Sequence, residues 1–398
     1  MSRCNLCGED AAEPLIEFGA HPIAHRFLST PDEPEYTHPL TLGVCRACGL
    51  SQLIDPIPAH ELYTNYNWLS SWKPNPHVPK LVAAIEALPG LSTESRVLEV
   101  GSNDGSFLAE LRERGFSRLL GLEPADDACA AAAERGIETI HGYFTPEAAQ
   151  AIVDDFGQAD LFVARHVLEH VQDLATFAAA MRIVLRAGGH VLVEVPDFDF
   201  SQAAPDYSAM WEEHVNHFTR RSMERFLQTA GVEAVSAESF LFSGQALAVF
   251  GRRSVETDAP EPAGDGAQAD AYRERWPRFR AAIAEYLAAR RANGARIGVY
   301  GAGGRAATLI NVCDLGGHVS VVLDDQPEKQ GRFMPGSRLP VVPGDTLARG
   351  ELDLCLLAVN AENEEAVIAR HGDFVAAGGE FASLHPPSPR LPAFWKDV

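Results

Sequence analysis

The chain has 398 residues, of which 46% are hydrophobic, and its formal net charge is -22 at pH 7. A chain of this length is expected to form two or three domains with hydrophobic cores. The acidic balance argues against a nucleic-acid partner, because phosphate binding needs clustered Lys and Arg residues that this sequence does not concentrate anywhere. The sequence has neither the apolar core of a signal peptide nor a run long enough to span a bilayer, so we expect a cytoplasmic protein with no membrane partner.

Two CxxCG motifs contain four of the cysteines. Cys4 and Cys7 form the first motif, and Cys45 and Cys48 form the second. Two such tight turns present four thiolates to one tetrahedral ion, which predicts a structural zinc site without an open coordination position. The alternatives are disulfides, which a cytosolic protein disfavours, and a redox dithiol, which would not need a second copy. The remaining cysteines stand in apolar contexts and are expected to be packing residues: Cys129, Cys313 and Cys355.

Between the cysteine motifs lie His21 and His25. Since four thiolates already complete a zinc site, we expect both histidines to be polar or packing residues at a domain interface. An aromatic segment follows at residues 60–72 and leads into a stretch with several prolines. Aromatic side chains of this kind either bury a domain junction or form a wall of a substrate pocket, and the sequence leaves both open.

A glycine turn at residues 101–105 is the centre of the next region. The apolar run before it predicts a buried strand, and a helix is expected to start near Ser106. Gly101 and Gly105 allow the backbone to approach a ligand where side chains would block it. The next apolar run ends at Glu123, where an acid would hold the ribose diol of a nucleotide. The alternative is an ordinary strand-helix turn whose glycines serve geometry alone.

Further apolar runs alternate with helical segments up to residue 195. This order predicts a doubly wound parallel sheet, and a helix with apolar spacing at residues 79–88 is expected to pack beside its first strand. His166 and His170 lie at the carboxyl end of the strand predicted at residues 159–166. Because ligands of open α/β sheets bind at the carboxyl ends of the strands, either histidine could face a ligand, and either could be a hydrogen-bonded cap.

The segment from Trp211 to His217 is too polar and aromatic for an ordinary crossover. It places Glu213 directly before His214, and Thr219 is expected to cap the helix that follows. A carboxylate beside a histidine is either a solvated loop without a task or a base held in the right tautomer. The residues of this segment leave both interpretations open.

The last part of the chain repeats the pattern of strand, glycine turn and helix. Residues 254–271 are rich in Pro, Gly, Ala and acids and predict a linker, and a helix ending at Gly294 follows. Gly301, Gly303 and Gly304 then form a second glycine turn, and Asp324 closes the next strand. The pattern predicts a second nucleotide site, either for a nicotinamide cofactor or for a nucleotide without redox chemistry.

The turn EVGSNDG resembles motif I of S-adenosylmethionine-dependent methyltransferases. Together with the paired CxxC motifs, HVLEHV, an E-H-x-x-x-F-[ST] segment and the second glycine turn, it makes essentially the whole chain resemble the sugar C-methyltransferases of deoxysugar biosynthesis. The resemblance implies an α/β protein of three parts. These are an N-terminal zinc-binding domain at residues 1–72, a central doubly wound Rossmann-like class I methyltransferase domain at 73–253, and a second Rossmann-like domain at 254–398, with 254–271 as its linker.

The resemblance also implies a reaction. A nucleotide-linked 4-keto sugar loses its C3 proton, and the resulting enolate attacks the methyl group of S-adenosylmethionine. His214 matches the general base, Glu213 its acidic neighbour, and His170 and Tyr66 two further catalytic residues. Trp211 departs from the family pattern, which has a tyrosine at this position, so the orientation and identity of the substrate could differ.

The remaining implied roles concern binding. Glu123 is expected on the ribose hydroxyls and Asp104 near the amino-acid end of S-adenosylmethionine. The full set of expected cofactor contacts is Glu99, Gly101, Asn103, Asp104, Gly105, Glu123, Pro124, Phe144 and His166. The expected contacts with the nucleotide-linked sugar are Trp211, His217, Gly303, Arg305 and Lys329. The zinc ligands are Cys4, Cys7, Cys45 and Cys48.

Three alternatives remain, one within the transferases and two from other classes of protein. An N- or O-methyltransferase of a nucleotide sugar would use the same cofactor turn and leave the α-proton untouched. An NAD-dependent oxidoreductase would use the C-terminal glycine turn. A zinc-ribbon nucleic-acid binder is disfavoured, because acidic residues outnumber basic ones around the cysteine motifs. We expect a monomer or a homodimer.

Overall fold

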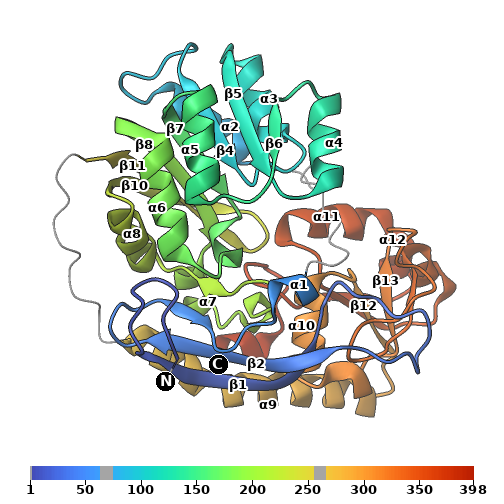
Figure 1. The fold of residues 1–398 in the computed structure, drawn as a ribbon. Helices are drawn as coiled ribbons and strands as arrows, with labels where there is room; N and C mark the ends of the chain where they lie inside the picture. The colour runs from blue at the N-terminus through green and yellow to red at the C-terminus, as the bar shows by residue number, and fades with distance from the viewer. Residues whose placement is uncertain (1, 63–74, 255–265) are drawn as a thin grey trace.

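The computed structural model describes residues 2–62, 75–254 and 266–398 of the chain. Its strands form a four-stranded, a seven-stranded and a five-stranded sheet. In Figure 1 the unit built on the seven-stranded sheet lies above the N-terminal and C-terminal units. Tyr66 and most of the aromatic segment at residues 60–72 lie outside the described residues.

The N-terminal sheet is antiparallel and has the order β1-β2-β3-β9. β9 comes from the middle of the chain, so the sheet is completed by a segment far away in sequence. A short helix, α1, follows β3 and spans Ala59–Leu62. The strands span Ala12–Pro22 (β1), Thr37–Cys45 (β2), Ser51–Leu53 (β3) and Asn216–His217 (β9).

The central sheet has the order β10-β11-β8-β7-β4-β5-β6. Only β11 runs against its neighbours among the described strands, so the doubly wound parallel sheet is confirmed. The chain moves from β4 outward to β5 and β6 and then returns to β7 on the other side of β4. This reversal is the point at which open α/β sheets bind ligands. The strands span Arg96–Val100 (β4), Arg118–Glu123 (β5), Thr139–His141 (β6), Ala159–Arg165 (β7), Leu185–Pro196 (β8), Val232–Leu241 (β10) and Gln245–Arg253 (β11).

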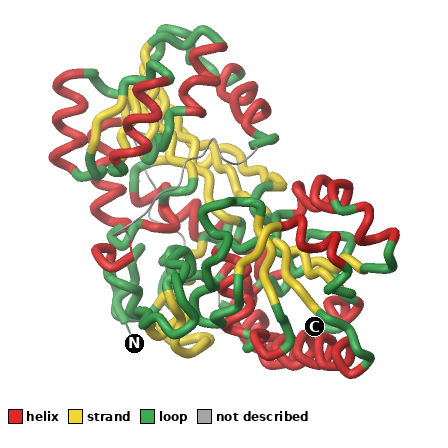
Figure 2. The backbone as a smooth tube through the Cα atoms, turned by 90° about the vertical axis from the view of Figure 1, so that its right-hand side faces the viewer, coloured by secondary structure: helices red, strands yellow, loops and turns green. Residues whose placement is uncertain are grey.

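Helices cover both faces of the central sheet (Figures 1 and 2). α5, α6 and α8 bury apolar side chains against one face, while α2 and α3 cover the other. The expected helix at residues 79–88 is confirmed as α2, and the helix capped by Thr219 is confirmed as α8. The helices span Val78–Glu86 (α2), Ser106–Glu113 (α3), Asp126–Glu134 (α4), Pro146–Asp155 (α5), Leu174–Val184 (α6), Phe198–Ala203 (α7) and Arg220–Thr229 (α8), with short 3₁₀ helices at Leu168–His170 (η2) and Tyr207–Ala209 (η3).

The C-terminal unit has a parallel sheet of order β14-β13-β12-β15-β16. Its order also reverses, between β12 and β15. The strands span Ile297–Tyr300 (β12), Val321–Asp324 (β13), Val341–Pro343 (β14), Leu354–Leu357 (β15) and Glu380–Ser383 (β16). The helices span Ala267–Ala292 (α9), Gly304–Val312 (α10), Ala361–Arg370 (α11) and Gly372–Ala376 (α12), with 3₁₀ turns at Leu315–Gly317 (η4), Gly344–Arg349 (η5) and Ala393–Lys396 (η6).

Helix α9 begins earlier than its sequence suggests, because residues 267–271 of the expected linker are already helical. The left-handed Gly266 precedes the helix, and Arg46 of the N-terminal unit holds its first turn. The two guanidinium nitrogens Nη1 and Nη2 each lie 3.0 Å from a carboxylate oxygen of Asp270. A bidentate ion pair of this kind fixes the orientation of both partners, so it favours a helical first turn of α9 over a flexible linker.

The three units share a hydrophobic core. Leu42 of β2, Tyr207 of η3, Phe279 of α9 and Leu309 of α10 belong to one buried cluster. The Tyr207 hydroxyl donates to the backbone carbonyl of Tyr272 at 2.7 Å, and the two rings stack with centroids 4.4 Å apart. None of the helices in the described ranges has the length and apolar character needed to cross a bilayer.

Candidate active site and zinc centre

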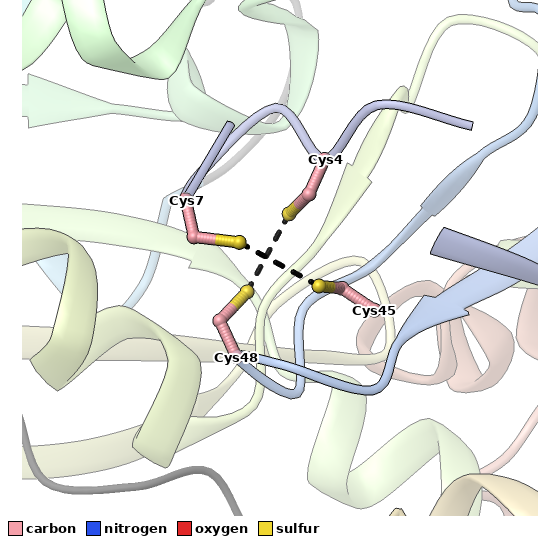
Figure 3. Close-up of side chains that lie close together, drawn as sticks. All are labelled: Cys4, Cys7, Cys45 and Cys48. Carbon is pink, nitrogen blue, oxygen red and sulfur yellow. Dashed lines mark hydrogen bonds between the residues drawn. The ribbon is translucent and has the colours of Figure 1, made fainter. Parts of the chain in front are cut away.

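The four cysteines of the CxxCG motifs converge on one point (Figure 3). The sulfur atoms of Cys4 and Cys48 are 3.4 Å apart, and those of Cys7 and Cys45 are 3.6 Å apart. All four sulfur atoms lie within 4.8 Å of one another. None of them forms a disulfide, so the thiolates are available for the tetrahedral set that zinc prefers.

The turns that carry these cysteines have the geometry of zinc knuckles. Gly8 and Gly49 follow the second cysteine of each motif and have positive φ values of 76° and 79°. Their backbone N–H groups donate to the carbonyls of Cys4 at 3.0 Å and Cys45 at 2.8 Å. Glycine adopts this left-handed conformation without strain, which explains its place after each motif. The residues present therefore fit a structural zinc ion.

A chain of amide hydrogen bonds connects the first knuckle to the central unit. Asn5, inside the first motif, donates from its side chain to Asn216 Oδ1 at 3.0 Å. Asn216 in turn donates from Nδ2 to the carbonyls of Leu168 at 2.9 Å and Val171 at 2.6 Å. These two carbonyls flank Glu169 and His170. The zinc centre thus helps to hold the loop after β7, although it lies outside the candidate active site.

The turn at residues 101–105 lies at the reversal of strand order between β4 and β7. Gly101 has φ 67°, and a Cβ atom there would come within 2.3 Å of Val167 Cγ2 from the loop after β7. Gly105 is the N-cap of α3 and has φ 70°. Both glycines are therefore required by the backbone and by close packing, and the turn places the N-terminus of α3 at the edge of the sheet where α/β proteins commonly bind ligands.

Glu123 closes this turn from the end of β5. Its carboxylate accepts hydrogen bonds from the backbone N–H of Asn103 at 2.9 Å and of Ala125 at 3.0 Å. Burial raises the pKa of Glu123, and the two N–H donors oppose that rise. Each oxygen retains a second lone pair, so the carboxylate can hold the turn and still accept from a ribose diol.

Asp104 lies on the inner side of the same turn and is fully buried. Its carboxylate accepts from the backbone N–H of Ser106 at 3.2 Å and lies 3.4 Å from the guanidinium of Arg135. These contacts stabilise the start of α3.

Glu99 is a buried acid on β4, two residues before Gly101, with a side chain 2% exposed. Its Oε2 atom has no hydrogen-bond partner among the described residues. Burial raises the pKa of Glu99 to about 8, against the opposing charge of Arg165. An orphaned carboxyl group beside the cofactor turn fits the ammonium group of S-adenosylmethionine.

The other expected cofactor contacts have different surroundings. Phe144 packs its ring against Phe162 and Phe177, with centroids 5.6 Å and 4.9 Å away. Pro124 accepts at its carbonyl from His141 Nε2 at 2.9 Å. Both residues therefore help to shape the region beyond β5 and β6.

A buried ion cluster occupies the carboxyl ends of β7 and β8, and sequence reasoning found only His166 of its members. Glu194 is fully buried and accepts from His77 Nε2 at 2.5 Å and from Arg165 Nε at 2.6 Å. Burial alone would lower the pKa of His166, but the carboxylates of Glu194 and Glu169 raise it to about 9. His166 is therefore protonated at neutral pH, and the ionised Glu194 lies beside it and balances its charge.

His170 and His214 lie together. Their rings meet edge to face with centroids 5.0 Å apart, and Trp211 contacts His214 in the same way at 4.7 Å. His170 Nδ1 donates to the backbone carbonyl of Glu213 at 2.9 Å. The structure thus brings His170, Trp211, Glu213 and His214 into one cluster.

The carboxylate of Glu213 points to an unexpected partner in the N-terminal unit. His25 Nδ1 lies 2.7 Å from Glu213 Oε1. The neighbouring Glu212 is 1% exposed and accepts from the backbone N–H of Ala24 at 2.7 Å. Burial, together with the charge of Glu213, raises the pKa of Glu212 to about 8. Both glutamates therefore anchor the His214 segment to the loop after β1.

The C-terminal glycine turn reaches the same cluster through Trp211. A Cβ atom on Gly304 would lie 1.8 Å from Trp211 Cζ3, so the indole rests directly on the backbone of that turn. Arg305, the next residue, is held from the central unit. Its Nη2 lies 2.6 Å from Asp206 Oδ2, and its Nε donates to Ser208 Oγ at 3.0 Å.

Asp324 repeats in the C-terminal unit the arrangement seen at Glu123. It accepts from the backbone N–H of Ala302 at 2.7 Å and of Gln326 at 2.8 Å. Lys329 lies 3.3 Å from the same carboxylate and is therefore an ion-pair partner in this structure. Both glycine turns are thus tied to the acid at the end of the neighbouring strand.

His217 lies away from this cluster, in β9, where it is 5% exposed and packs against the Phe198 ring. Burial lowers the pKa of His217 to about 3, so the imidazole is neutral.

Sequence reasoning assigned no role in the site to three further residues of the region. Glu169 lies within HVLEHV, and its position one turn from the expected histidine was a usable signal. His25 was seen and interpreted only as an interface residue. His385, fully buried after β16 with neither ring nitrogen paired among the described residues, stands in no motif that could have indicated it.

Models of three protein families match successive parts of the chain. A zinc binding domain matches residues 4–63, a methyltransferase domain matches residues 77–237, and a C-methyltransferase C-terminal domain matches residues 263–386. The curated protein C-methyltransferase NovU from Streptomyces niveus is 29% identical over 98% of this chain and 97% of its own length.

Solved structures similar to the chain are S-adenosylmethionine-dependent methyltransferases. One from Mesorhizobium loti is 18% identical with a TM-score of 0.34, and the match covers 44% of this chain and 96% of that one. One from Anabaena variabilis is 17% identical with a TM-score of 0.38, and the match covers 49% of this chain and 91% of that one. The family models and the curated relative show that the chain is an S-adenosylmethionine-dependent methyltransferase that joins a zinc-binding domain and a C-methyltransferase C-terminal domain to its catalytic unit.

Proposed function

We propose that this enzyme methylates a nucleotide-linked 4-keto deoxysugar at C3, the carbon next to the ketone. The observation that carries the proposal is a continuous series of contacts through His214. On one side His214 meets His170, which lies in the loop that packs on Gly101. On the other side it meets Trp211, which packs on Gly304 of the C-terminal unit. A histidine between two nucleotide-binding turns can act on a sugar that spans them.

The chemistry explains why a base is needed at this point. A proton next to a ketone is too weakly acidic to leave unaided near neutral pH, so a positioned base and donors to the enolate oxygen are required. In our proposal His214 accepts the C3 proton while the electron pair moves into the C4 carbonyl. The enolate carbon then bonds to the methyl carbon, the carbon–sulfur bond breaks, and the proton on His214 passes to solvent. Such a base typically contributes about 10²–10⁴-fold to the rate.

Donors to the enolate oxygen are proposed at His170 and Tyr66. His170 is already oriented, because its Nδ1 donates to the Glu213 carbonyl at 2.9 Å. Glu213 is proposed to hold this arrangement through His25 rather than to contact the substrate.

S-adenosylmethionine supplies a methyl group that is already activated by its sulfonium charge. We place its ribose at Glu123 and its ammonium group at Glu99, whose buried carboxyl group lacks a partner among the described residues. Asp104 is occupied by Ser106 and Arg135 and is proposed to act by holding the turn. The remaining contacts are proposed from Asn103, Pro124, Phe144 and His166.

The nucleotide part of the sugar is proposed to lie at the C-terminal glycine turn. Backbone N–H groups at the start of α10 can receive a diphosphate, with Gly303 and Arg305 closest to it. Arg305 is 12% exposed and already neutralised by Asp206, so it would share its guanidinium between carboxylate and phosphate. Lys329 would have to leave Asp324 to contribute. His217 is proposed to pack behind the site as a neutral ring.

A panel of nucleotide-linked 4-keto sugars tests the proposal. Each sugar is incubated with the protein and methyl-labelled cofactor, and the position of the new methyl group is read by mass spectrometry and NMR. We expect a carbon–methyl bond at C3. Methylation at C5, the other carbon next to the ketone, would support the same base-catalysed chemistry but contradict C3 as the acceptor atom. A methyl group on nitrogen or oxygen would instead support an N- or O-methyltransferase, and calorimetric binding of NADH would support the oxidoreductase alternative.

A further inference from the structure

Glu169 is a buried acid next to the proposed base. It lies in η2 between Leu168 and His170 and is 1% exposed. A carboxylate oxygen of Glu169 and one ring nitrogen each of His170 and His214 lie within 4.8 Å of one another. Among the described residues it is therefore the carboxylate that accompanies the histidine pair.

Glu213, the acid expected to assist His214, is occupied elsewhere. Its Oε1 atom receives His25 Nδ1 at 2.7 Å, and the Glu213 side chain is only 7% exposed. A carboxylate that is already paired with one imidazole in the N-terminal unit has less capacity to stabilise charge on a second one. The position directly before His214 in sequence thus does not make Glu213 the electrostatic partner of the base.

One oxygen of Glu169 is left without a hydrogen bond in the resting protein. Oε1 lies 3.3 Å from His166 Nδ1, whereas Oε2 is buried and has no partner among the described residues. Buried carboxylate oxygens are normally paired, and an unpaired one beside a catalytic group calls for a partner that forms during turnover. A protonated imidazole is such a partner.

We propose that Glu169 is a positioning residue that stabilises the imidazolium formed when the His170–His214 pair accepts the substrate proton. The proposal rests on the proposed function, because it assigns a partner to the base of that reaction. The proton moves from the sugar carbon to the imidazole, its electron pair stays with the enolate, and Glu169 keeps its charge throughout. In catalytic triads a buried acid likewise stabilises the protonated form of a catalytic histidine.

The other charges near the pair favour this assignment. His166 Nδ1 lies 3.3 Å from Glu169 Oε1, and His166 Nε2 lies 3.8 Å from Glu194. His25 contacts Glu213. Removing the charge of Glu169 should therefore lower the pKa of the base, since a nearby negative charge stabilises its protonated form.

Solvent exchange measures the base without methyl transfer. The protein is incubated with thymidine diphosphate 4-keto-6-deoxyglucose and S-adenosylhomocysteine in deuterated buffer, and deuterium next to the ketone is followed by NMR across a pH series. For Glu169→Gln we expect the exchange rate to fall by roughly 10²-fold, at the low end of what a positioned base contributes. The acid limb of the pH profile should move down by about one pH unit.

Two further variants serve as controls. Glu169→Asp keeps the negative charge, so the acid limb of its pH profile should match that of the wild type. This variant also tests the charge if Glu169→Gln folds poorly. Glu364→Gln removes an acid in the C-terminal unit that is as buried as Glu169, and it should leave rate and pH limb unchanged. Affinity for S-adenosylhomocysteine should stay within about threefold in each variant.

Three results would overturn the inference. An exchange rate and pH limb in Glu169→Gln equal to those of the wild type would show that the carboxylate does not act on the base. Loss of a metal ion beyond the one held by the four cysteines would make Glu169 a metal ligand instead. A wild-type protein that exchanges no proton over the uncatalysed background would remove the proposed function itself, and this inference with it.

Discussion

The indole of Trp211 lies so close to Gly304 that a Cβ atom on residue 304 would come within 1.8 Å of Trp211 Cζ3. Trp211 belongs to the loop that carries His214, and Gly304 is the first residue of α10. Real Cβ atoms do not approach another heavy atom so closely, so the tryptophan fits only because residue 304 is glycine. This contact connects the C-terminal unit to the proposed base.

Gly304→Ala should therefore impair catalysis more than folding. The added methyl group has to displace the indole, which contacts the His214 ring at a centroid distance of 4.7 Å. We expect methyl transfer to fall by about tenfold or more, since small displacements of a base are costly. Zinc content and cofactor affinity should be unchanged. The matched control is Gly372→Ala, where no described atom lies within 4 Å of the new Cβ; equal activity in both variants would show that the contact does not matter.

His25 should be needed to hold Glu213. A hydrogen bond to a charged group contributes about 1.5–3 kcal/mol, and His25→Ala leaves the buried Glu213 carboxylate without it. We expect kcat to fall by about tenfold in this variant. His25→Asn places an amide nitrogen near the position of Nδ1 and should restore most of the loss. His38→Ala, in the same unit, is the control, because its ring contacts Asp55 and the variant leaves the pair of His25 and Glu213 in place. Failure of the asparagine to rescue would argue against the hydrogen bond.

Sequence could indicate those parts of the site that are built from neighbouring residues. The zinc knuckles and the Gly101 turn follow from local spacing, and Glu123 follows from strand order. The pairing of His25 with Glu213 could not be predicted, because it joins residues 188 positions apart that share no periodic pattern. The same holds for β9, a strand of two residues whose partner is β3. These contacts depend on how the three units pack against one another, which local sequence patterns do not specify.

Cys45→Ser should abolish the zinc centre and destabilise the N-terminal unit. Structural zinc contributes about 10–16 kcal/mol to the folding of small zinc-binding peptides, and three thiolates bind it far less well. Metal analysis should find about one zinc per chain in the wild type and little in the variant. Thermal unfolding should shift to lower temperature.

Asn216→Ala is the companion of this variant. It should keep the zinc ion but lose the hydrogen bonds to Leu168 and Val171 that steady the loop of His170. A fall in activity with full zinc content would show that the loop affects activity independently of the metal ion. A zinc-free wild type with redox-active thiols would contradict the structural role.

Cofactor binding should release protons near neutral pH if Glu99 meets the ammonium group. Burial raises the pKa of Glu99 to about 8, so its carboxyl group is largely protonated in the free enzyme at pH 7. A bound cation favours the ionised form and expels the proton. Calorimetry of S-adenosylhomocysteine binding in buffers of different ionisation enthalpy should show this release, and Glu99→Gln should remove it.

The same shift has a consequence for stability. A carboxyl group whose pKa is higher in the folded than in the unfolded chain binds more protons when folded, so stability falls as pH rises from about 4.3 towards about 8. Glu212, which has the same shift, adds to this trend. The unfolding temperature of the free protein should decline over that range, and less steeply in Glu99→Gln. A flat profile in the wild type would mean that Glu99 is ionised without the cofactor.

His214→Asn separates carbon methylation from its alternatives. An asparagine can keep a hydrogen bond but cannot accept a proton at working pH, so both solvent exchange and methyl transfer should be lost. Affinity for the cofactor and for the sugar should remain, because the ring lies between the two glycine turns rather than in either. Trp211→Tyr should shift the sugar preference and leave exchange intact, since it places a hydroxyl near His214 without removing the base. If His214→Asn methylates at the wild-type rate, the base is another residue, with His170 first in contact distance, or the acceptor atom is not carbon.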